Sequence, residues 1–224
     1  MPLISTLIGK LQRHPKRFVF PAGSNPRVIQ AARQIVTRKM GVPILLGDRT
    51  EIKNIAAKHE ISLKGMRIIT PERSDEFDGF VEKFKEIRKT KEITHEIAEK
   101  TLRNKNYFAS MMLASSQVDA LISGTTEAAS GLRALFQIIP KQKDVQTASS
   151  LLILDFEERK VGVDGNLFLA DCGVIPNPTT EQLSEIAITT ARLAYHLTNV
   201  APRIAMLSYS TKSATKRPDL EKIR

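Results

Sequence analysis

The sequence of 224 residues contains no tryptophan, a single cysteine and only 5% aromatic residues. One cysteine excludes an internal disulfide framework and a zinc site built from several cysteines. No apolar run approaches the roughly 20 residues that a membrane helix requires. The short apolar N-terminal stretch is not preceded by a basic segment, so we do not expect a secretory signal. With 42% hydrophobic and 26% charged residues, the composition is typical of a soluble globular protein, and we expect a cytoplasmic one.

Several motifs that mark common enzyme classes are also missing. No P-loop, no Gly-x-Gly-x-x-Gly after a strand and no Gly-x-Ser-x-Gly elbow is present. The four histidines, His14, His59, His95 and His196, are far apart in the sequence, and no pair has the spacing of a helical zinc site. Cys172 follows an apolar run, which predicts a packed, inert thiol in preference to a nucleophile. We therefore expect neither a metal nor a cofactor.

The charge is distributed unevenly along the chain. The formal net charge is +10, and residues 1–112 hold 22 basic and 12 acidic side chains, whereas residues 113–224 hold 12 of each. A one-sided positive field attracts anions such as nucleic acid, an acidic membrane surface or a phosphorylated small molecule. A solvated surface that keeps the protein in solution explains the same charge. Nucleic-acid bases stack on aromatics interleaved with arginine or lysine. Phe18 and Phe20 lie in an apolar run that predicts a strand, so core packing explains them better.

Short apolar runs alternate with amphipathic stretches in the first half of the chain. The predicted strands cover residues 17–21, 42–47, 66–71 and 119–124. The predicted helices cover residues 27–38 and 51–60, with two or three more between 75 and 118. Such alternation predicts an α/β fold, with an open, mostly parallel sheet and helices on both faces. We assign residues 1–145 to this first domain.

The second half has a different pattern. Two apolar runs, residues 149–156 and 165–170, are joined by a charged segment and predict an antiparallel pair. A long helix is expected over residues 180–198, and another strand over residues 203–210. Residues 219–224 have the composition of a helix start. We assign residues 146–224 to a second α/β domain and expect it to be incomplete.

Three predicted strands end in loops rich in small hydroxyl residues, glycine or a cation: residues 21–27, 123–126 and 208–213. In an open α/β sheet, ligands bind at the carboxyl ends of the strands. Backbone N–H groups and a following helix N-terminus suit such loops to phosphate. Each loop alone is explained equally well by turn formation. Three together, in a chain with a basic first half, favour a phosphorylated ligand.

Seven segments, taken in chain order, resemble the phosphate acetyl/butyryl transferase family. They are Phe20-Pro21-Ala22-Gly23-Ser24-Asn25-Pro26-Arg27-Val28, Pro43-Ile44-Leu45-Leu46-Gly47, Glu86-Ile87-Arg88-Lys89, Asn106-Tyr107-Phe108-Ala109-Ser110-Met111-Met112, Phe168-Leu169-Ala170-Asp171-Cys172-Gly173, Asn177-Pro178-Thr179 and Ala205-Met206-Leu207-Ser208-Tyr209-Ser210-Thr211-Lys212. The resemblance runs over essentially the whole chain. It implies an isocitrate/isopropylmalate-dehydrogenase-like architecture.

The resemblance also implies an activity, the reversible transfer of an acetyl group between coenzyme A and inorganic phosphate. In this family the coenzyme A thiolate attacks the acetyl carbonyl directly, so neither a metal nor a protein nucleophile is needed. Arg88 and Arg133 match arginines that bind coenzyme A or its phosphates. The other substrate-binding positions implied are Ser123, Gly124, Thr125, Ser208, Ser210, Thr211 and Lys212. The partners implied are coenzyme A or acetyl-CoA and phosphate or acetyl phosphate, with no nucleic acid and no membrane, and complete family members are expected to be homodimers.

The sequence departs from the family in two places. The loop at residues 125–134 lacks the family's usual histidine and a proline after the arginine, and Glu127 adds a negative charge there. The family's catalytic base and Ser-Arg pair lie beyond Arg224, so no residue here inherits those roles. Two alternatives to an enzyme therefore stay open: a transferase-like domain that senses acyl-CoA or acetyl phosphate, and a nucleic-acid-binding protein that relies on charge alone.

Overall fold

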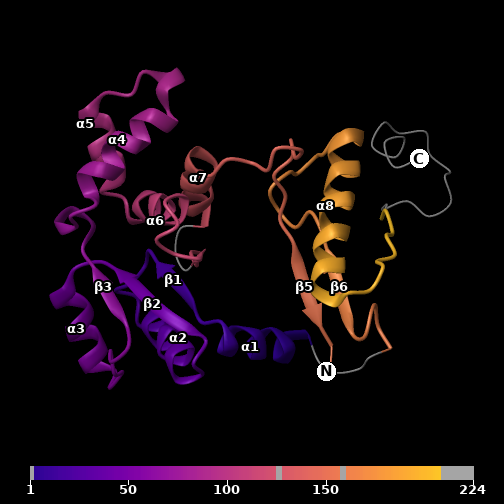
Figure 1. The fold of residues 1–224 in the computed structure, drawn as a ribbon, viewed down its shortest axis with the longest axis horizontal. Helices are drawn as coiled ribbons and strands as arrows, with labels where there is room; N and C mark the ends of the chain where they lie inside the picture. The colour runs from indigo at the N-terminus through magenta and orange to yellow at the C-terminus, as the bar shows by residue number, and fades with distance from the viewer. Residues whose placement is uncertain (1–2, 125–127, 157–159, 208–224) are drawn as a thin grey trace. The chain divides into compact units, whose positions relative to one another are not determined.

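The computed structural model describes residues 3–124, 128–156 and 160–207 (Figure 1). The chain divides into two compact units, one of residues 8–140 and one of residues 1–7 with 141–224. Helix α1 (Leu3–Arg13), which the sequence patterns did not predict, contains the boundary between them. Among the described residues, no helix combines the length and the apolar character that crossing a membrane demands.

A four-stranded parallel sheet forms the centre of the larger unit (Figure 1). Its strands are β1 (Lys16–Phe20), β2 (Gly41–Leu46), β3 (Arg67–Ile69) and β4 (Ala120–Leu121), in the order β3-β2-β1-β4. The register pairs Lys16 with Gly41, Ile44 with Arg67 and Phe18 with Ala120. All four strands that the sequence predicted are present, and all run parallel.

Successive side chains along each strand point to opposite faces of the sheet. Val19, Ile44 and Leu46 pack against one helical layer and are at most 1% exposed. That layer consists of α4 (Phe77–Ile87), α5 (His95–Leu102) and α6 (Lys105–Ala114). Phe20 and Leu45 pack on the other face, against α2 (Pro26–Thr37) and α3 (Arg49–Lys58). The predicted α/β fold with helices on both faces is confirmed.

Local capping signals explain where the helices of the larger unit begin. The side chain of Asn25 accepts a hydrogen bond from the backbone N–H of Arg27, and Pro26 occupies the first turn of α2. Asp48 caps α3 in the same way through the N–H of Glu51. Short 3-10 turns follow at Pro71–Arg73 and Lys89–Lys91. Helix α7 (Ala128–Ile138) was not predicted, and it completes the unit by packing on α6.

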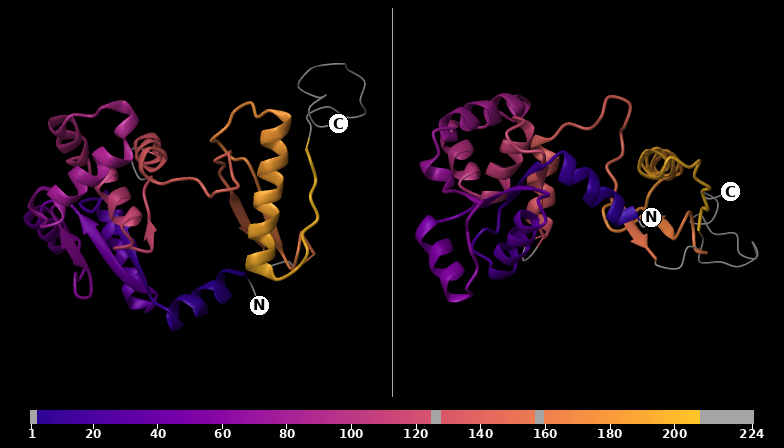
Figure 2. Two further views of the ribbon diagram at one scale, coloured as in Figure 1. Left: turned by 45° about the horizontal axis from the view of Figure 1, so that its top comes forward. Right: turned by 60° about the horizontal axis from the view of Figure 1, so that its bottom comes forward.

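The smaller unit contains an antiparallel pair and one long helix. Strands β5 (Leu152–Asp155) and β6 (Asn166–Leu169) pair with Leu152 opposite Leu169, as the sequence predicted. Helix α8 (Thr180–Thr198) lies beside this pair in the views of Figures 1 and 2. It begins with a capping box in which Thr179 and Gln182 bond each other's backbone N–H groups. The predicted bounds of this helix are confirmed.

Two predictions for the smaller unit are wrong. The described part of the expected strand at residues 203–210, Arg203–Leu207, is not in a strand, because it has no ladder partner among the described residues. Cys172, expected to be packed, is exposed. It lies within the bend that follows β6, and its thiol donates a hydrogen bond to the carbonyl oxygen of Leu169 at 3.0 Å. An apolar strand therefore does not imply a buried residue after its end.

The carboxylate of Asp171 holds together the turn that follows β6. It accepts hydrogen bonds from the backbone N–H groups of Ser150, Val174 and Ile175 at 2.8, 3.1 and 2.6 Å, and a further one from the Ser150 hydroxyl. Partial burial raises the pKa of Asp171, but these hydrogen bonds outweigh it and hold the pKa well below its usual range. The carboxylate thus joins residue 150 to residues 171–175.

Candidate functional site

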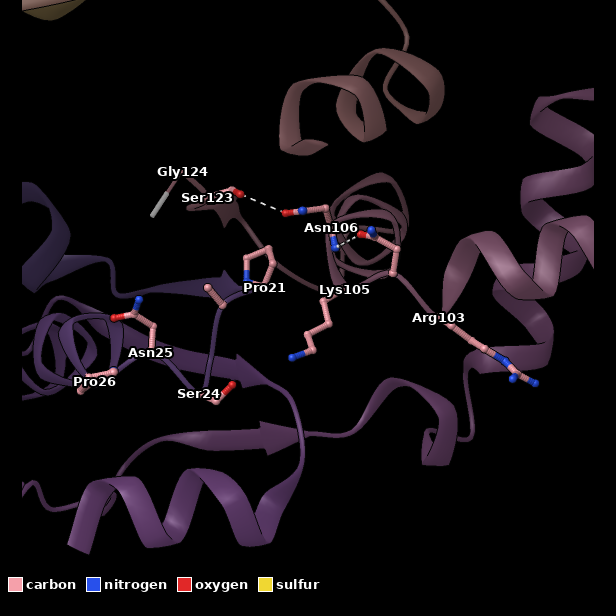
Figure 3. Close-up of a pocket in the computed structure, with 11 residues that line it drawn as sticks. Pro21, Ser24, Asn25, Pro26, Arg103, Lys105, Asn106, Ser123 and Gly124 are labelled. Atoms are coloured by element: carbon pink, nitrogen blue, oxygen red, sulfur yellow. Dashed lines mark hydrogen bonds between the residues drawn. The ribbon is translucent and has the colours of Figure 1, made fainter. Parts of the chain in front are cut away.

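The order of the strands places a crevice at the carboxyl end of the sheet. From β1 the chain passes to β2 on one side, and β4 pairs with β1 on the other, so the direction of winding reverses between β1 and β4. Ligands of open α/β sheets bind at this reversal. A cavity of about 610 Å³ lies there (Figure 3). Its lining consists of Pro21, Ala22, Ser24, Asn25, Pro26, Arg103, Asn104, Lys105, Asn106, Ser123 and Gly124.

The loop after β1 is held close to β2 and places the N-terminus of helix α2 at the cavity. The backbone N–H of Gly23 donates to the carbonyl of Leu46 at 3.2 Å, and that of Asn25 donates to Ala22 at 3.0 Å. A Cβ atom on Gly23 would lie 2.6 Å from the Leu46 carbonyl oxygen, so only glycine fits here without a backbone shift. Asn25 and Pro26, which begin α2, both line the cavity. The positive end of this helix therefore faces the cavity.

A second helix start meets the cavity from the other side. Asn104 caps α6 by accepting a hydrogen bond from the N–H of Asn106 at 2.9 Å. Arg103 and Lys105 flank this cap, so the segment brings two cations to the lining. Arg103 also pairs with Glu99 one helical turn earlier. Lys105 belongs to no ion pair within the described part of the chain.

One hydrogen bond joins the strand-end loop to α6. The hydroxyl of Ser123 donates to the side-chain oxygen of Asn106 at 2.9 Å (Figure 3). Helix α7 lies directly against this pair, because a Cβ atom on Gly131 would lie 2.9 Å from the Ser123 oxygen. The side chain of Ser123 is thus fixed by neighbours on two other elements.

The cavity is lined by groups that can bind an anion. Two helix N-termini and two cationic side chains line it, and its 11 lining residues include no carboxylate. Backbone N–H groups at helix N-termini and lysine or arginine side chains are the usual ligands of phosphate. The lining also includes no histidine or cysteine. The described part of the lining therefore offers phosphate ligands but no group that would accept a proton from a thiol.

The model of the phosphate acetyl/butaryl transferase family matches residues 3–224. The chain belongs to this family. It is 36% identical to a phosphate acetyltransferase of Thermoanaerobacterium thermosaccharolyticum and 34% identical to one of Clostridium acetobutylicum, and each alignment covers 100% of this chain and 68% of the relative.

Solved structures agree with the family assignment. The EutD phosphotransacetylase from Staphylococcus aureus matches with a TM-score of 0.81 and 29% identity, over 100% of this chain and 66% of that one. A phosphotransacetylase from Streptococcus pyogenes matches with a TM-score of 0.83 and 33% identity, over 98% of this chain and 66% of that one. The chain therefore spans about two thirds of the length of these four family members.

Two of the three predicted strand-end loops meet at the cavity. Ser123 and Gly124 line it together with the loop that follows β1. The predicted residues Thr125, Ser208, Ser210, Thr211 and Lys212 lie outside the described residues.

The two predicted arginines do not line this cavity. Arg88 ends α4, and its Nε atom is buried without a hydrogen-bond partner in the described part of the chain. Arg133 is an exposed residue of α7. Their roles toward coenzyme A stay predictions.

The sequence patterns missed the contribution of α6. Asn106 was noted only as part of a family segment, and Arg103 and Lys105 were not singled out. The pair of cations around a capping asparagine, Arg103-Asn104-Lys105, is the signal that marks an anion-binding helix start. Within the described ranges, no group of three histidine, cysteine, aspartate or glutamate side chains could hold a metal ion.

Replacing Gly23 by alanine should disturb the cavity from the side of the loop. The new Cβ would contact the backbone of Leu46, so the loop must move away from β2. We expect the free energy of unfolding to fall by about 1–3 kcal/mol and phosphate binding, measured by calorimetry, to weaken. Gly79→Ala in α4 is the matched control, because nothing lies within 4 Å of its Cβ position. That change should be neutral or stabilise the protein by up to about 1 kcal/mol. Equal effects of the two changes would contradict this account of the loop.

Proposed function

We propose that this chain carries the phosphate-binding part of a phosphate acetyltransferase, which catalyses acetyl-CoA + phosphate = coenzyme A + acetyl phosphate. The observation that carries the proposal is the cavity between β1 and β4, with its two helix starts, Arg103, Lys105 and no carboxylate. Relatives named phosphate acetyltransferase, aligned over the whole chain, support the same reaction.

The proposed reaction assigns a defined task to the cavity. In the direction of acetyl-CoA synthesis, the coenzyme A thiolate forms a bond to the acetyl carbon, and the bond from that carbon to the phosphate oxygen breaks. The phosphate leaves with the electron pair of that bond. Lys105 and the N–H groups at the starts of α2 and α6 would stabilise this growing negative charge. In the reverse direction the same groups would hold phosphate as the nucleophile.

The thiol proton requires a base that the cavity lining does not provide. Among the described residues, the lining contains no histidine, cysteine or carboxylate. A thiol of ordinary pKa is mostly protonated at neutral pH. Relatives are longer, since the chain covers 68% of the length of two of them. We therefore assign the base to the part of the family's length that these 224 residues do not match. Arg88 and Arg133 remain our candidates for coenzyme A, in a cytoplasmic enzyme that forms a homodimer when complete.

A coupled assay of the 224-residue protein tests the proposal. Acetyl phosphate and coenzyme A are supplied, and acetyl-CoA formation is measured next to a version extended to the length of the relatives. Activity of the extended protein, with phosphate binding but slow or no turnover by the shorter one, is the expected result. Failure of both proteins to bind phosphate or acetyl phosphate would overturn the proposal. Tight acetyl-CoA binding without turnover by the extended protein would favour a sensor instead.

Replacing Lys105 by methionine should weaken phosphate binding. The change keeps the length of the side chain but removes a cation that no described carboxylate neutralises. Loss of one charge-assisted hydrogen bond corresponds to about a tenfold rise in the Kd of inorganic phosphate, measured by calorimetry. Lys100→Met on the exposed side of α5 is the control, and its Kd should stay within about twofold. Equal Kd values for the two variants would remove Lys105 from the site.

A further inference from the structure

The larger unit contains a second cavity, of about 660 Å³, that shares no lining residue with the first. It lies between β1, β2 and β3, helix α6 and the segment before α4. The residues that line it are Arg17, Ile44, Arg49, Arg67, Ile68, Ile69, Thr70, Arg73, Ser74, Asp75, Glu76, Phe108, Met112 and Gln117. Four of them are arginines. Its volume is in the range of sites that hold a small organic ligand, about 300–1,000 Å³.

The strand pattern places two of these arginines on the helix-covered face of the sheet. Arg17 precedes Val19 by two residues in β1, and Arg67 precedes Ile69 by two residues in β3. Val19 and Ile69 both pack against the layer of α4, α5 and α6. Because side chains alternate along a strand, Arg17 and Arg67 share that face. Both arginines are solvent-exposed, so their guanidinium groups are accessible to a ligand in the cavity.

Among the described residues, only Arg17 of the four arginines has a hydrogen-bond acceptor. Arg17 bonds Asp119 at 3.1 Å and the carbonyl of Ser116 at 3.0 Å. The pKa of Asp119 is lowered to about 2 by the side-chain hydrogen bond from Arg17 and by the bond from its backbone N–H. The guanidinium groups of Arg49, Arg67 and Arg73 have neither a hydrogen bond nor an ion pair within the described part of the chain. Three guanidinium groups therefore line the cavity without a hydrogen-bond acceptor among the described residues.

The cavity also has an acidic side. Asp75 and Glu76 belong to its lining at the start of α4, and neither pairs with an arginine among the described residues. Along β3, the distance from Arg67 to Thr70 is about 10 Å at 3.3 Å per residue. An occupant that satisfies both sides must therefore combine acceptors for guanidinium groups with donors for carboxylates. Inorganic phosphate is too small to span that distance.

A nucleotide has this combination of groups. Its phosphate oxygens accept bidentate hydrogen bonds from arginine, and its ribose hydroxyls donate to an aspartate or glutamate, as in dinucleotide-binding folds. Three unpaired guanidinium groups match the charge of a diphosphate better than that of a single phosphate. We propose that the cavity lined by Arg49, Arg67, Arg73, Asp75 and Glu76 binds a nucleoside diphosphate group. The residues that line this cavity differ from those that the proposed function uses.

Calorimetric titration of the 224-residue protein with ADP, pyrophosphate and adenosine tests the proposal. ADP should bind more tightly than either of the other two, because only ADP uses both sides of the cavity. Arg67→Gln and Arg73→Gln should each raise the Kd of ADP by about tenfold, the effect of one charge-assisted hydrogen bond. Asp75→Asn should weaken the binding of ADP but not that of pyrophosphate. The exposed Arg38, at the end of α2, gives the control Arg38→Gln, which should leave the Kd of ADP within about twofold.

One more variant distinguishes binding at the first cavity from binding at the second. Lys105→Met lies in the first cavity and should leave ADP binding unchanged while it weakens phosphate binding. Coenzyme A contains the same diphosphate group, so it is titrated as well. If Arg67→Gln weakens the binding of coenzyme A and of ADP alike, the cavity holds the nucleotide part of a substrate. If it weakens the binding of ADP alone, the cavity holds a free nucleotide. The proposal would be overturned if ADP did not bind or bound no better than pyrophosphate. It would also be overturned if ADP binding were lost in Lys105→Met but kept in Arg67→Gln.

Discussion

Replacing Phe108 by alanine should lower the free energy of unfolding of the larger unit by about 3–5 kcal/mol. Phe108 is 1% exposed, and its ring meets that of Phe80 edge-on at 5.2 Å and stacks on that of Phe77 at 6.3 Å. The change removes a large buried side chain and two aromatic contacts between α6 and α4, and the surrounding helices cannot close the resulting cavity fully. Unfolding by urea, followed by circular dichroism, measures the loss.

This substitution also tests how the fold supports the site. Phe108 lies two residues after Asn106 and packs α6 against α4. Helix α6 also places Lys105 and Asn106 in the lining of the first cavity, the one between β1 and β4. The folded fraction of Phe108→Ala should therefore bind phosphate more weakly. Phe136→Ala in α7 is the control, because its ring is 50% exposed, and it should cost less than about 1 kcal/mol. Similar losses for both variants would show that Phe108 is not a core anchor.

Asp171→Asn should destabilise the smaller unit by about 2–3 kcal/mol. The substitution removes the negative charge and places an amide N–H₂ group where a carboxylate oxygen now accepts from the N–H groups of Val174 and Ile175. Thermal unfolding monitored by signals of the smaller unit measures the loss. Asp144→Asn is the matched control, since Asp144 is exposed and its carboxylate accepts no hydrogen bond within the described part of the chain, and its effect should stay within about 0.5 kcal/mol.

The same substitution has a defined pH dependence. The folded-state pKa of Asp171 is depressed, so its contribution to stability is present above the unfolded value of about 3.9 and is lost as the pH falls toward the folded value. The difference between the native protein and Asp171→Asn should therefore be constant near neutral pH and shrink below about pH 4. A difference that stayed constant down to pH 2 would mean that the charge of Asp171 is not what stabilises the turn.

Much of the fold could be predicted because it depends on local patterns. Periodic apolar residues located most of the strands and helices. The caps at Asn25, Asp48 and Thr179 explain where three of the helices begin. The prediction of a strand at residues 203–210 was wrong for the described residues, 203–207. A strand forms only with a pairing partner, which the local sequence does not reveal. The family resemblance was confirmed by matches over the whole chain.

The site was only partly predictable, because it depends on distant contacts. The loops after β1 and β4 were expected to bind phosphate, and parallel pairing of adjacent strands brings them together. The contribution of Lys105 comes from a helix between those loops in sequence, and only packing brings its N-terminus to the same edge. Arg67 was treated as part of an ordinary strand, since its position on the covered face follows from the register with Ile44.

The strand order also determines when the anion cavity can form during folding. Strands β1 and β2 pair within residues 16–46, whereas the contact between Arg17 and Asp119 closes a loop of 102 residues. Closing so long a loop costs more chain entropy than the local pairings do, so it comes after them. On the ribosome, β1, β2 and β3 can assemble while β4 is still unsynthesised. This edge of the sheet is thus completed after β1, β2 and β3 have paired, and an anion bound there would stabilise a late folding step.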